Sequence, residues 1–245
     1  MTPLPPDRPA GMSRREWREQ RMAKSTPTPQ PPAAPSLFGS AKPAESTDDA
    51  RPTILTVCTG NICRSPMAEV LLRARLESLG VRVHSAGTHA LVDHAMTEPA
   101  QALAVESGAS PADAAAHSAR YLVEPYLLGA DLVLAMAREH RSYAVKMMPS
   151  RMRRTFTVRE FARLASTLST DQAHAAAEAA GADPKARLAA VLQAVTDQRG
   201  LVPADPEDDD VIDPYRRSQE TYAKSAAQLI PALDEVERVV RAALG

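Results

Sequence analysis

The sequence predicts an α/β domain built on a four-stranded parallel sheet with helices on both faces. Short apolar segments alternate with helical patterns from residue 53 onward, and connections that hold a helix place successive strands parallel. Strands buried on both faces show such continuous apolar runs. The expected strands are TILTV (53–57), VRVHS (81–85), ADLVLAM (130–136) and RRTFTV (153–158).

A loop and a helix follow the first strand. Ser65 supplies a helix N-cap and Pro66 suits the first helical position, after which leucines recur at helical spacing as far as Gly80. Further helices are expected at 97–108, 138–148 and 217–244, the last with Pro231 as the point where a kink would fall.

One segment does not fit this alternation. Between the fourth strand and the closing helix lie two further helical patterns, STDQAHAAAEAAG and DPKARLAAVLQAVTDQRG. Asp183 and Pro184 begin the second pattern, whose apolar residues fall on one helical face. We therefore expect a helical insertion at about 165–203, packed on a domain that spans 51–245.

Composition limits the other properties of the chain. Residues 1–50 are rich in Pro, Ser, Thr and Ala with few large apolar residues, which predicts a disordered tail. The net charge of −1 gives no overall field that attracts nucleic acid or anionic lipid. The sequence shows neither an apolar run of about 18 residues nor a secretory signal, so a cytoplasmic location is expected. No pattern predicts the oligomeric state.

The two cysteines of the chain, Cys58 and Cys63, lie in the loop between the first strand and its helix, within the run VCTGNICRSPMAE (57–69). Two cysteines this close together do not form a disulfide scaffold, which favours a chemical role. In open α/β sheets ligands bind at the carboxyl ends of strands, and a helix N-terminus there offers N–H groups to an anion.

The residues around these cysteines suit a phosphate group. Gly60 and Asn61 readily adopt left-handed backbone conformations, so the loop amides can curl into a nest for a dianion. Arg64 adds a planar fork for two phosphoryl oxygens. The same positive field stabilises a thiolate at Cys58, placed for in-line attack on phosphorus and formation of a phosphocysteine.

With these motifs, the sequence resembles the low-molecular-weight protein tyrosine phosphatase family, whose signature matches VCTGNICRSPMAE nearly letter for letter. The resemblance covers most of 53–164 and 211–240, with further matches at HSAGT (84–88), HSAR (117–120), ADLVLAM and DPY (213–215). It implies a cysteine-dependent, metal-independent phosphatase without a cofactor that acts on phosphorylated proteins, chiefly on phosphotyrosine.

The resemblance also implies roles for the matching residues of the loop. Cys58 is the nucleophile, Arg64 clamps the phosphate, Asn61 shapes the loop and Ser65 donates its hydroxyl to the thiolate. The other residues expected at the substrate are Thr59, Gly60, Ile62, Cys63, Leu91 and Tyr215.

Residues behind the loop are expected to support it. The resemblance implies that Ser85 braces the loop and that Glu69 and His117 form a pair near it. Cys63 has two interpretations: it packs as a small apolar residue, or it forms a reversible disulfide with Cys58, as the family implies.

Expulsion of a tyrosine phenolate needs a proton donor, because its conjugate acid has a pKa of about 10. Asp213 is the candidate, since it precedes Pro214 on a loop and the family places its general acid in the same Asp-Pro-Tyr motif. Acidic residues stand just upstream, at Asp205 and 207–210. They either hold a proton on Asp213 by like-charge repulsion or form a solvated turn.

Four positions depart from the family or from one of its subgroups. Arg216 and Arg217 follow Tyr215 where the family usually has an aromatic residue or glycines, so they either recruit acidic peptides or are merely solvated. Leu91 stands where the family often has an aromatic residue, which weakens stacking on a substrate ring. A protein-arginine phosphatase subgroup carries threonine at the position of Ile62, and the apolar side chain here suits an aryl group better.

The same residues leave three functions open besides that of a tyrosine phosphatase. They are a protein-arginine phosphatase, an arsenate reductase that uses an external thiol, and a phosphoprotein-binding module without catalysis. The module is disfavoured because binding alone requires neither Cys58 nor Asp213. No metal site is expected, and the histidines are interpreted mostly as surface or capping residues: His84, His89, His94, His117, His140 and His174.

Overall fold

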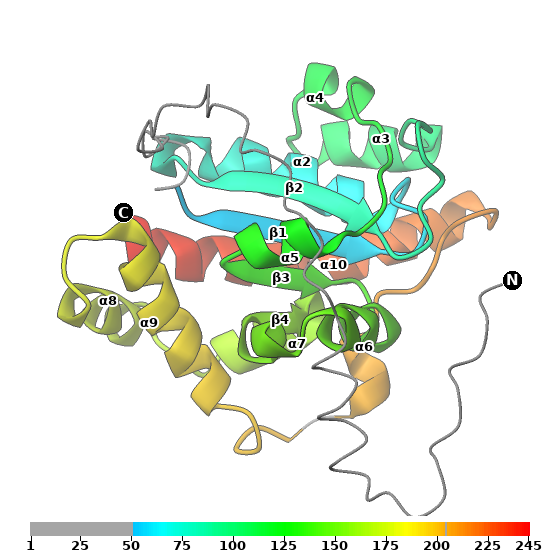
Figure 1. The fold of residues 1–245 in the computed structure, drawn as a ribbon. Coiled ribbons are helices and arrows are strands. Elements are labelled where there is room, and N and C mark those ends of the chain that lie inside the picture. Colours follow the sequence, from blue (N-terminus) through cyan, green and yellow to red (C-terminus); the bar gives the residue numbers. More distant parts are fainter. Residues whose placement is uncertain (1–50, 204) are drawn as a thin grey trace, which may run out of the picture. The chain divides into compact units, whose positions relative to one another are not determined.

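The protein is described by a computed structural model, which places residues 51–203 and 205–245. The predicted tail at 1–50 lies outside the described residues. Four strands form one parallel sheet in the order β2-β1-β3-β4, which confirms the predicted fold class (Figure 1). The strands are β1 (Thr53–Cys58), β2 (Arg82–Gly87), β3 (Leu132–Ala135) and β4 (Thr155–Thr157).

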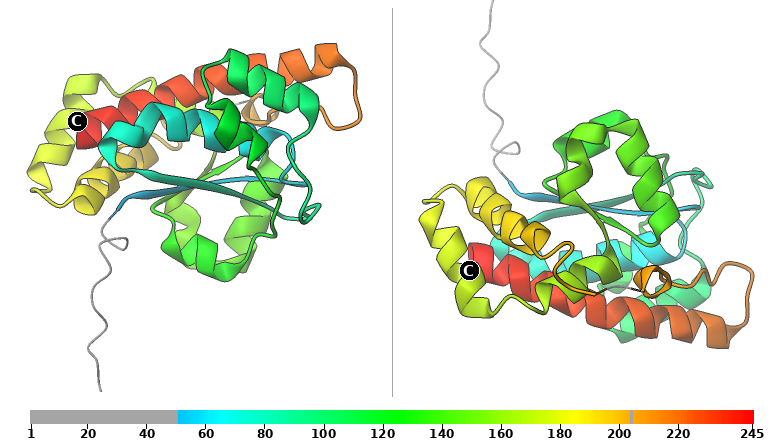
Figure 2. Two further views of the ribbon diagram at one scale, coloured as in Figure 1. Left: turned by 90° about the horizontal axis from the view of Figure 1, so that it is seen from above. Right: turned by 90° about the horizontal axis from the view of Figure 1, so that it is seen from below.

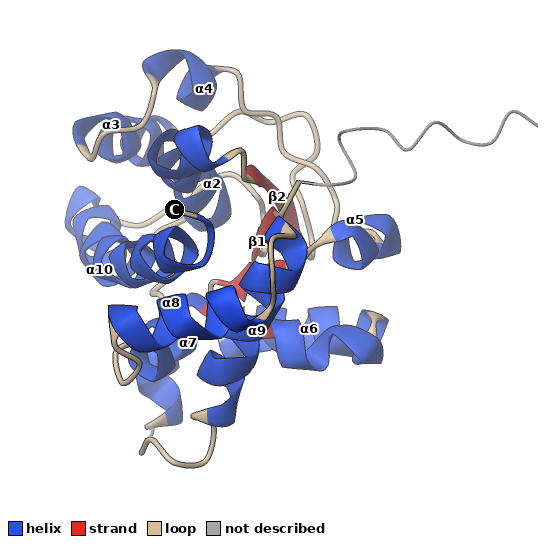
Figure 3. Cartoon of the chain, turned by 90° about the vertical axis from the view of Figure 1, so that its left-hand side faces the viewer, coloured by secondary structure: helices blue, strands red, loops and turns tan. Residues whose placement is uncertain are grey.

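Helices cover both faces of this sheet, as Figures 2 and 3 show. One face carries α5 (Glu124–Gly129) and α6 (Arg138–Met147). The other face carries the longer helices and their neighbours: α2 (Arg64–Leu76), α3 (Glu98–Glu106), α4 (Pro111–Ala115), α7 (Val158–Ala165), α8 (Thr170–Ala179), α9 (Pro184–Asp197) and α10 (Gln219–Leu244). Three 3-10 turns, η1 (Glu77–Leu79), η2 (Pro149–Arg154) and η3 (Pro206–Asp209), complete the described elements.

The central strand explains why the sheet needs cover on both sides. All six residues of β1 are buried, so its alternate side chains enter two separate cores. Leu55 and Val57 pack with Val133 under α5 and α6, whereas Ile54 packs with Leu132 and Leu134 under the larger helical layer. Burial of both faces fixes the register of β1 and therefore the position of the loop that follows it.

The segment predicted as an insertion forms α8 and α9, which contact each other and α10. Ser169 and Asp183 cap these two helices by accepting hydrogen bonds from backbone N–H groups. Arg187 on α9 donates through Nε to the carbonyl oxygen of Ala243, 2.7 Å away, and so satisfies one of the last carbonyls of α10. α10 continues as one helix through Pro231.

The order of the strands determines where a ligand can bind. The chain leaves β1 toward β2 on one side of the sheet and returns to β3 on the other side. Connections at the carboxyl ends of β1 and β3 therefore diverge, and such a switch point leaves a crevice in open α/β sheets. Cys58 ends β1, and Met136 follows β3 at this same edge.

Candidate active site

A cavity of about 160 Å³ opens at the carboxyl ends of β1 and β3. Its floor is the loop from Cys58 to Arg64, called here the phosphate loop. Its lining residues are Cys58, Thr59, Gly60, Ile62, Cys63, Arg64, His89, Leu91, Asp213 and Tyr215. The structure thus brings together the predicted nucleophile, the arginine and the candidate acid, although 155 positions separate Cys58 from Asp213 in the printed sequence.

The carbonyl groups of the phosphate loop face away from the cavity. Those of Cys58, Thr59, Gly60 and Ile62 accept hydrogen bonds of 2.9 to 3.0 Å from the N–H groups of Thr88, His89, Leu91 and Thr97, which follow β2. In a trans peptide the carbonyl and the next N–H point in opposite directions. The N–H groups that follow these carbonyls are therefore turned toward the inside of the loop.

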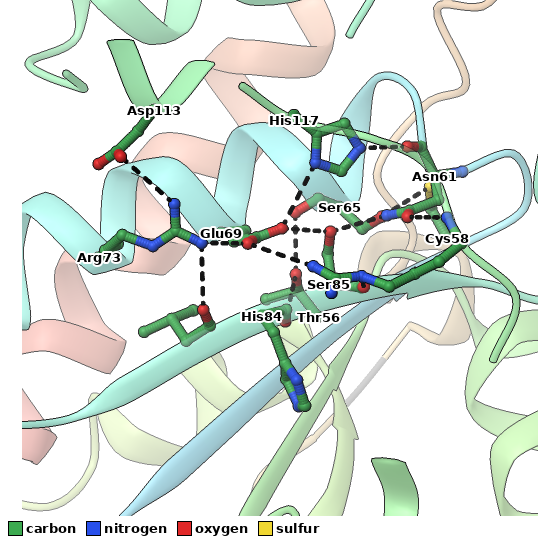
Figure 4. Close-up of polar contacts among 12 residues, drawn as sticks. Thr56, Cys58, Asn61, Ser65, Glu69, Arg73, His84, Ser85, Asp113 and His117 are labelled. Atoms are coloured by element: carbon green, nitrogen blue, oxygen red, sulfur yellow. Dashed lines mark hydrogen bonds and ion pairs between the residues drawn. The ribbon is translucent and has the colours of Figure 1, made fainter. Parts of the chain in front are cut away.

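The sulfur of Cys58 lies within this loop and receives two polar contacts. The backbone N–H of Asn61 points at Sγ from 3.3 Å, and Ser65 Oγ lies 3.0 Å from the same sulfur (Figure 4). The residue is 3% exposed. The Asn61 N–H donates to the sulfur, whereas either atom can be the donor in the contact with Ser65.

Asn61 holds the loop in its curled form. Its φ angle of 56° lies in the left-handed region, which few residues other than glycine and asparagine adopt. Its side-chain Nδ2 donates to Ser65 Oγ at 3.0 Å and to Ser85 Oγ at 2.7 Å, and its Oδ1 accepts from the N–H of Arg120 at 2.9 Å. The side chain is fully buried, so these bonds fix the backbone from behind (Figure 4).

A buried carboxylate supports this network. Glu69 on α2 accepts a hydrogen bond from Ser85 Oγ, pairs with Arg73, and lies 3.6 Å from Nδ1 of His117. His117 in turn donates from Nε2 to the carbonyl oxygen of Asn61 at 2.7 Å. Burial alone would raise the pKa of Glu69, but hydrogen bonds from His117 and Ser85, with the charge of Arg73, lower it. Ser85, Glu69 and His117 all lie behind the phosphate loop, and their supporting roles remain predictions (Figure 4).

Arg64 connects the phosphate loop to the acid loop, the segment 205–215. Its Nη1 donates to the carbonyl oxygen of Val211 at 3.0 Å, and its Nη2 lies 3.0 Å from Oδ2 of Asp213. The arginine side chain is 5% exposed, whereas the Asp213 side chain is 54% exposed. The guanidinium is therefore fixed at one end, and the carboxylate is open to the cavity mouth.

The cavity walls are mostly apolar. Tyr215 stands on the acid loop, and Ile62 and Leu91 lie on the phosphate loop and the segment after β2. The guanidinium of Arg216 lies 5.1 Å from the centre of the Tyr215 ring. Arg216 and Arg217 are exposed, and which of their two interpretations holds stays open.

Cys63 also lines the cavity, but its sulfur has different partners from that of Cys58. Its sulfur is 3.3 Å from Thr97 Oγ1 and 3.6 Å from the hydroxyl of Tyr222 on α10. Burial raises the pKa of the Cys63 thiol, despite these two hydrogen bonds. Both cysteines are free thiols, and the disulfide between them stays a prediction.

Two histidines at the site were not singled out from the sequence. His140, in the first turn of α6, is 1% exposed and its Nε2 lies 2.8 Å from Thr59 Oγ1. Burial, with the nearby charge of Arg64, lowers the pKa of His140 to about 4, which keeps the ring neutral. His89 lines the cavity itself. The interpretation of the histidines as mostly surface or capping residues is wrong for His140, whose side chain is buried against the loop.

Comparisons with known proteins show the family of the chain. Residues 53–198 match the family model described as low molecular weight phosphotyrosine protein phosphatase. The chain is 44% identical over 97 residues to the low molecular weight protein-tyrosine-phosphatase Etp of Escherichia coli K12, which covers 40% of this chain and 62% of Etp. The aligned part thus spans less than two thirds of that relative. Because the family match takes in more than half of the chain, the chain belongs to this family.

Two further relatives define the range of the resemblance. The chain is 38% identical over 108 residues to a protein-arginine-phosphatase of Geobacillus stearothermophilus, covering 44% of this chain and 70% of the relative. A crystal structure of the low molecular weight protein tyrosine phosphatase from T. tengcongensis is 29% identical, covers 76% of this chain and 97% of its own, and superposes with a TM-score of 0.51.

The described residues contain no candidate metal site and no candidate membrane-spanning helix. Within 51–203 and 205–245, no three His, Cys, Asp or Glu residues are grouped so that they could hold a metal ion. Within the same ranges, no helix has the length and apolar character needed to cross a membrane.

Proposed function

We propose that the protein hydrolyses phosphomonoesters through a phosphocysteine intermediate, with phosphotyrosine in proteins as the substrate. One observation supports this most strongly: Cys58 Sγ lies inside a loop whose carbonyls face outward, with Asn61 N–H pointing at the sulfur. A phosphate dianion fits where peptide N–H groups and a helix N-terminus converge. Arg64 supplies a bidentate cation at the same loop.

The residues divide the reaction into two displacements. The Cys58 thiolate attacks phosphorus, the P–S bond forms, and the P–O bond to the phenol breaks while Asp213 gives its proton to the leaving oxygen. Asp213, now a carboxylate, takes a proton from water as the water oxygen attacks phosphorus. The P–S bond then breaks, which releases inorganic phosphate and restores the thiolate. Loop N–H groups and Arg64 hold the equatorial oxygens throughout.

The contact between Arg64 and Asp213 supports the assignment of the acid. The two groups lie 3.0 Å apart, so a phosphate bound by Arg64 comes within reach of the Asp213 carboxyl group. Asp213 lies outside the residues that match the family model, so its assignment depends on this contact and on the Asp-Pro-Tyr motif.

The cavity walls favour an aryl group. Ile62, Leu91 and Tyr215 present apolar and aromatic surface to the substrate, which suits the phenyl ring of phosphotyrosine. A protein-arginine phosphatase is the second candidate, because one relative that is 38% identical carries that name. The two free thiols support a cytoplasmic location, because thiols stay reduced in that compartment. The substrates would then be cytoplasmic phosphoproteins.

Turnover of an aryl phosphate in the presence of EDTA tests the proposal, with the parent protein compared with Cys58→Ser and Asp213→Asn. We expect no turnover in the first variant and a large fall in the second, greatest for poor leaving groups. Activity that survives Cys58→Ser would contradict the mechanism. Retained binding of phosphopeptides by an inactive parent protein would instead favour the binding module. A panel of phosphotyrosine and phosphoarginine peptides separates the two substrate classes.

A further inference from the structure

Two of the acidic residues before Asp213, Asp209 and Asp210, are paired with arginines, whereas Asp205, Glu207 and Asp208 are exposed. Asp209 is only 8% exposed and receives the guanidinium of Arg163 on α7, whose Nη2 lies 3.1 and 3.2 Å from its two carboxylate oxygens. Nε of the same arginine lies 3.3 Å from Asp209 Oδ1. A buried carboxylate that is matched by such a fork has little positional freedom.

Asp210, the next residue, is bound to α6. Its Oδ1 accepts the backbone N–H of Arg138 at 2.7 Å, at the start of that helix, and its Oδ2 lies 3.0 Å from Nη2 of the Arg138 side chain. Arg159 on α7 donates through Nη1 to the Asp210 carbonyl oxygen at 2.9 Å. Asp210 is thus held by its side chain from one helix and by its backbone from another.

The two residues that follow are also bound. The N–H of Val211 donates to the carbonyl oxygen of Met136 at 2.9 Å, directly after β3. The N–H of Ile212 donates to Oε1 of Gln228 on α10 at 2.9 Å. Every residue from 209 to 212 is therefore bound to an element outside the acid loop, and Asp213 comes next in the chain.

We propose that Asp209 and Asp210 are positioning residues that, through Arg163 and Arg138, hold the Asp213 carboxyl group over the phosphate loop. This inference rests on the proposed function. Asp213 itself is half exposed and contacts Arg64 and the N–H of Tyr215, so the anchored segment before it sets where its backbone lies. A proton donor must come within about 3 Å of the leaving oxygen, and a misplacement of about 1 Å can cost up to about 100-fold in rate.

The proposal predicts a loss that depends on the leaving group. We compare kcat/KM for phenyl phosphate, whose phenol needs a proton, with kcat/KM for p-nitrophenyl phosphate, whose phenolate leaves without one. In Asp209→Asn and Asp210→Asn, we expect the first value to fall at least about 10-fold and the second to fall less than about 3-fold. Asp234→Asn is the control, because it also breaks an aspartate–arginine pair, but one outside the acid loop. Asp234 on α10 lies 2.8 Å from Arg75 on α2.

A double-mutant comparison distinguishes positioning from a general structural role. If Asp209 acts through Asp213, adding Asp209→Asn to Asp213→Asn causes no further fall in kcat/KM for phenyl phosphate. Equal losses with both substrates, or a full additional loss in the double variant, would overturn the proposal. If Asp209→Asn does not fold, the more exposed pair provides the same test through Asp210→Asn and Arg138→Gln. An inactive parent protein would count against the proposed function instead.

Discussion

Replacement of Asn61 by alanine is the sharpest test of how the phosphate loop is held. The substitution removes three hydrogen bonds, to Ser65, Ser85 and the N–H of Arg120, from a side chain that is fully buried. It also leaves a residue with a Cβ at a φ angle of 56° without the local stabilisation that asparagine provides there.

The expected loss of stability follows from these contacts. Ser65 and Ser85 keep other partners, Cys58 and Glu69, and Arg120 is only partly buried, so that water can reach its N–H group. Each of the three lost bonds is therefore taken at about 1 kcal/mol rather than at the full cost of an orphaned group. The left-handed backbone adds about 1 kcal/mol for alanine. We therefore expect Asn61→Ala to unfold with about 4 kcal/mol less free energy than the parent protein. Asn61→Gly should lose about 3 kcal/mol, because glycine adopts the backbone conformation without strain.

Urea denaturation of the parent protein and the two variants measures these differences. A loss of about 4 kcal/mol corresponds to a fall in Tm of roughly 8 to 16 °C for a domain of this size. The reasoning would be refuted by an alanine variant within 1 kcal/mol of the parent protein. It would also be refuted by a glycine variant that is less stable than the alanine variant.

Three other substitutions test separate parts of the account. Gly87→Ala would place a Cβ 2.5 Å from the carbonyl oxygen of Thr59, so we expect a lower Tm and a lower kcat/KM. Gly129→Ala is the control and should be near neutral, because its Cβ would meet no atom within 4 Å. Equal effects of the two substitutions would contradict this expectation. The pKa of His140 is lowered from 6.5 to about 4, so the unfolded chain binds the proton first as the pH falls. The neutral His140 ring therefore stabilises the folded protein above pH 6.5, and about 3 kcal/mol of this stabilisation should be lost as the pH falls toward 4. In His140→Gln, the unfolding free energy measured by urea denaturation should fall less steeply between these two pH values. An unchanged slope would contradict this prediction. Leu91→Trp should lower KM for a phosphotyrosine peptide while leaving inhibition by inorganic phosphate unchanged, and an unaltered KM would show that this wall does not contact the ring.

The sheet was predictable because burial leaves a clear pattern in the sequence. β1 and β3 are short, mainly apolar runs, and all four strands were expected within a few residues of their observed bounds. The helices α4, α5 and α7 were not predicted. α4 and α5 are only 5 and 6 residues long, too short for a helical repeat to appear in the sequence. The predicted fourth strand ran into α7, whose capping box at Thr157 and Glu160 marks the true boundary.

The site was predictable where one local motif carries it. The run from Cys58 to Arg64 specifies a loop conformation through its own residues, so its position after β1 follows from sequence order. Contacts that depend on the tertiary arrangement could not be inferred. The hydrogen bond between His140 and Thr59 joins α6 to the phosphate loop. The ion pair between Asp209 and Arg163 joins the acid loop to α7. Neither pair has a spacing that marks it in the sequence.

The central claim is that the sulfur of Cys58 becomes covalently bonded to phosphorus. The most direct measurement is rapid acid quenching of the protein during turnover of an aryl phosphate, followed by mass spectrometry of the peptide that contains residues 52–64. With p-nitrophenyl phosphate, whose phenolate leaves without a proton, Asp213→Asn should slow mainly the second displacement and so increase the trapped amount. The account predicts a phosphoryl group on Cys58 that is absent in Cys58→Ala. Turnover at the normal rate with no phosphorylated Cys58, or with the phosphoryl group on another residue, would contradict it.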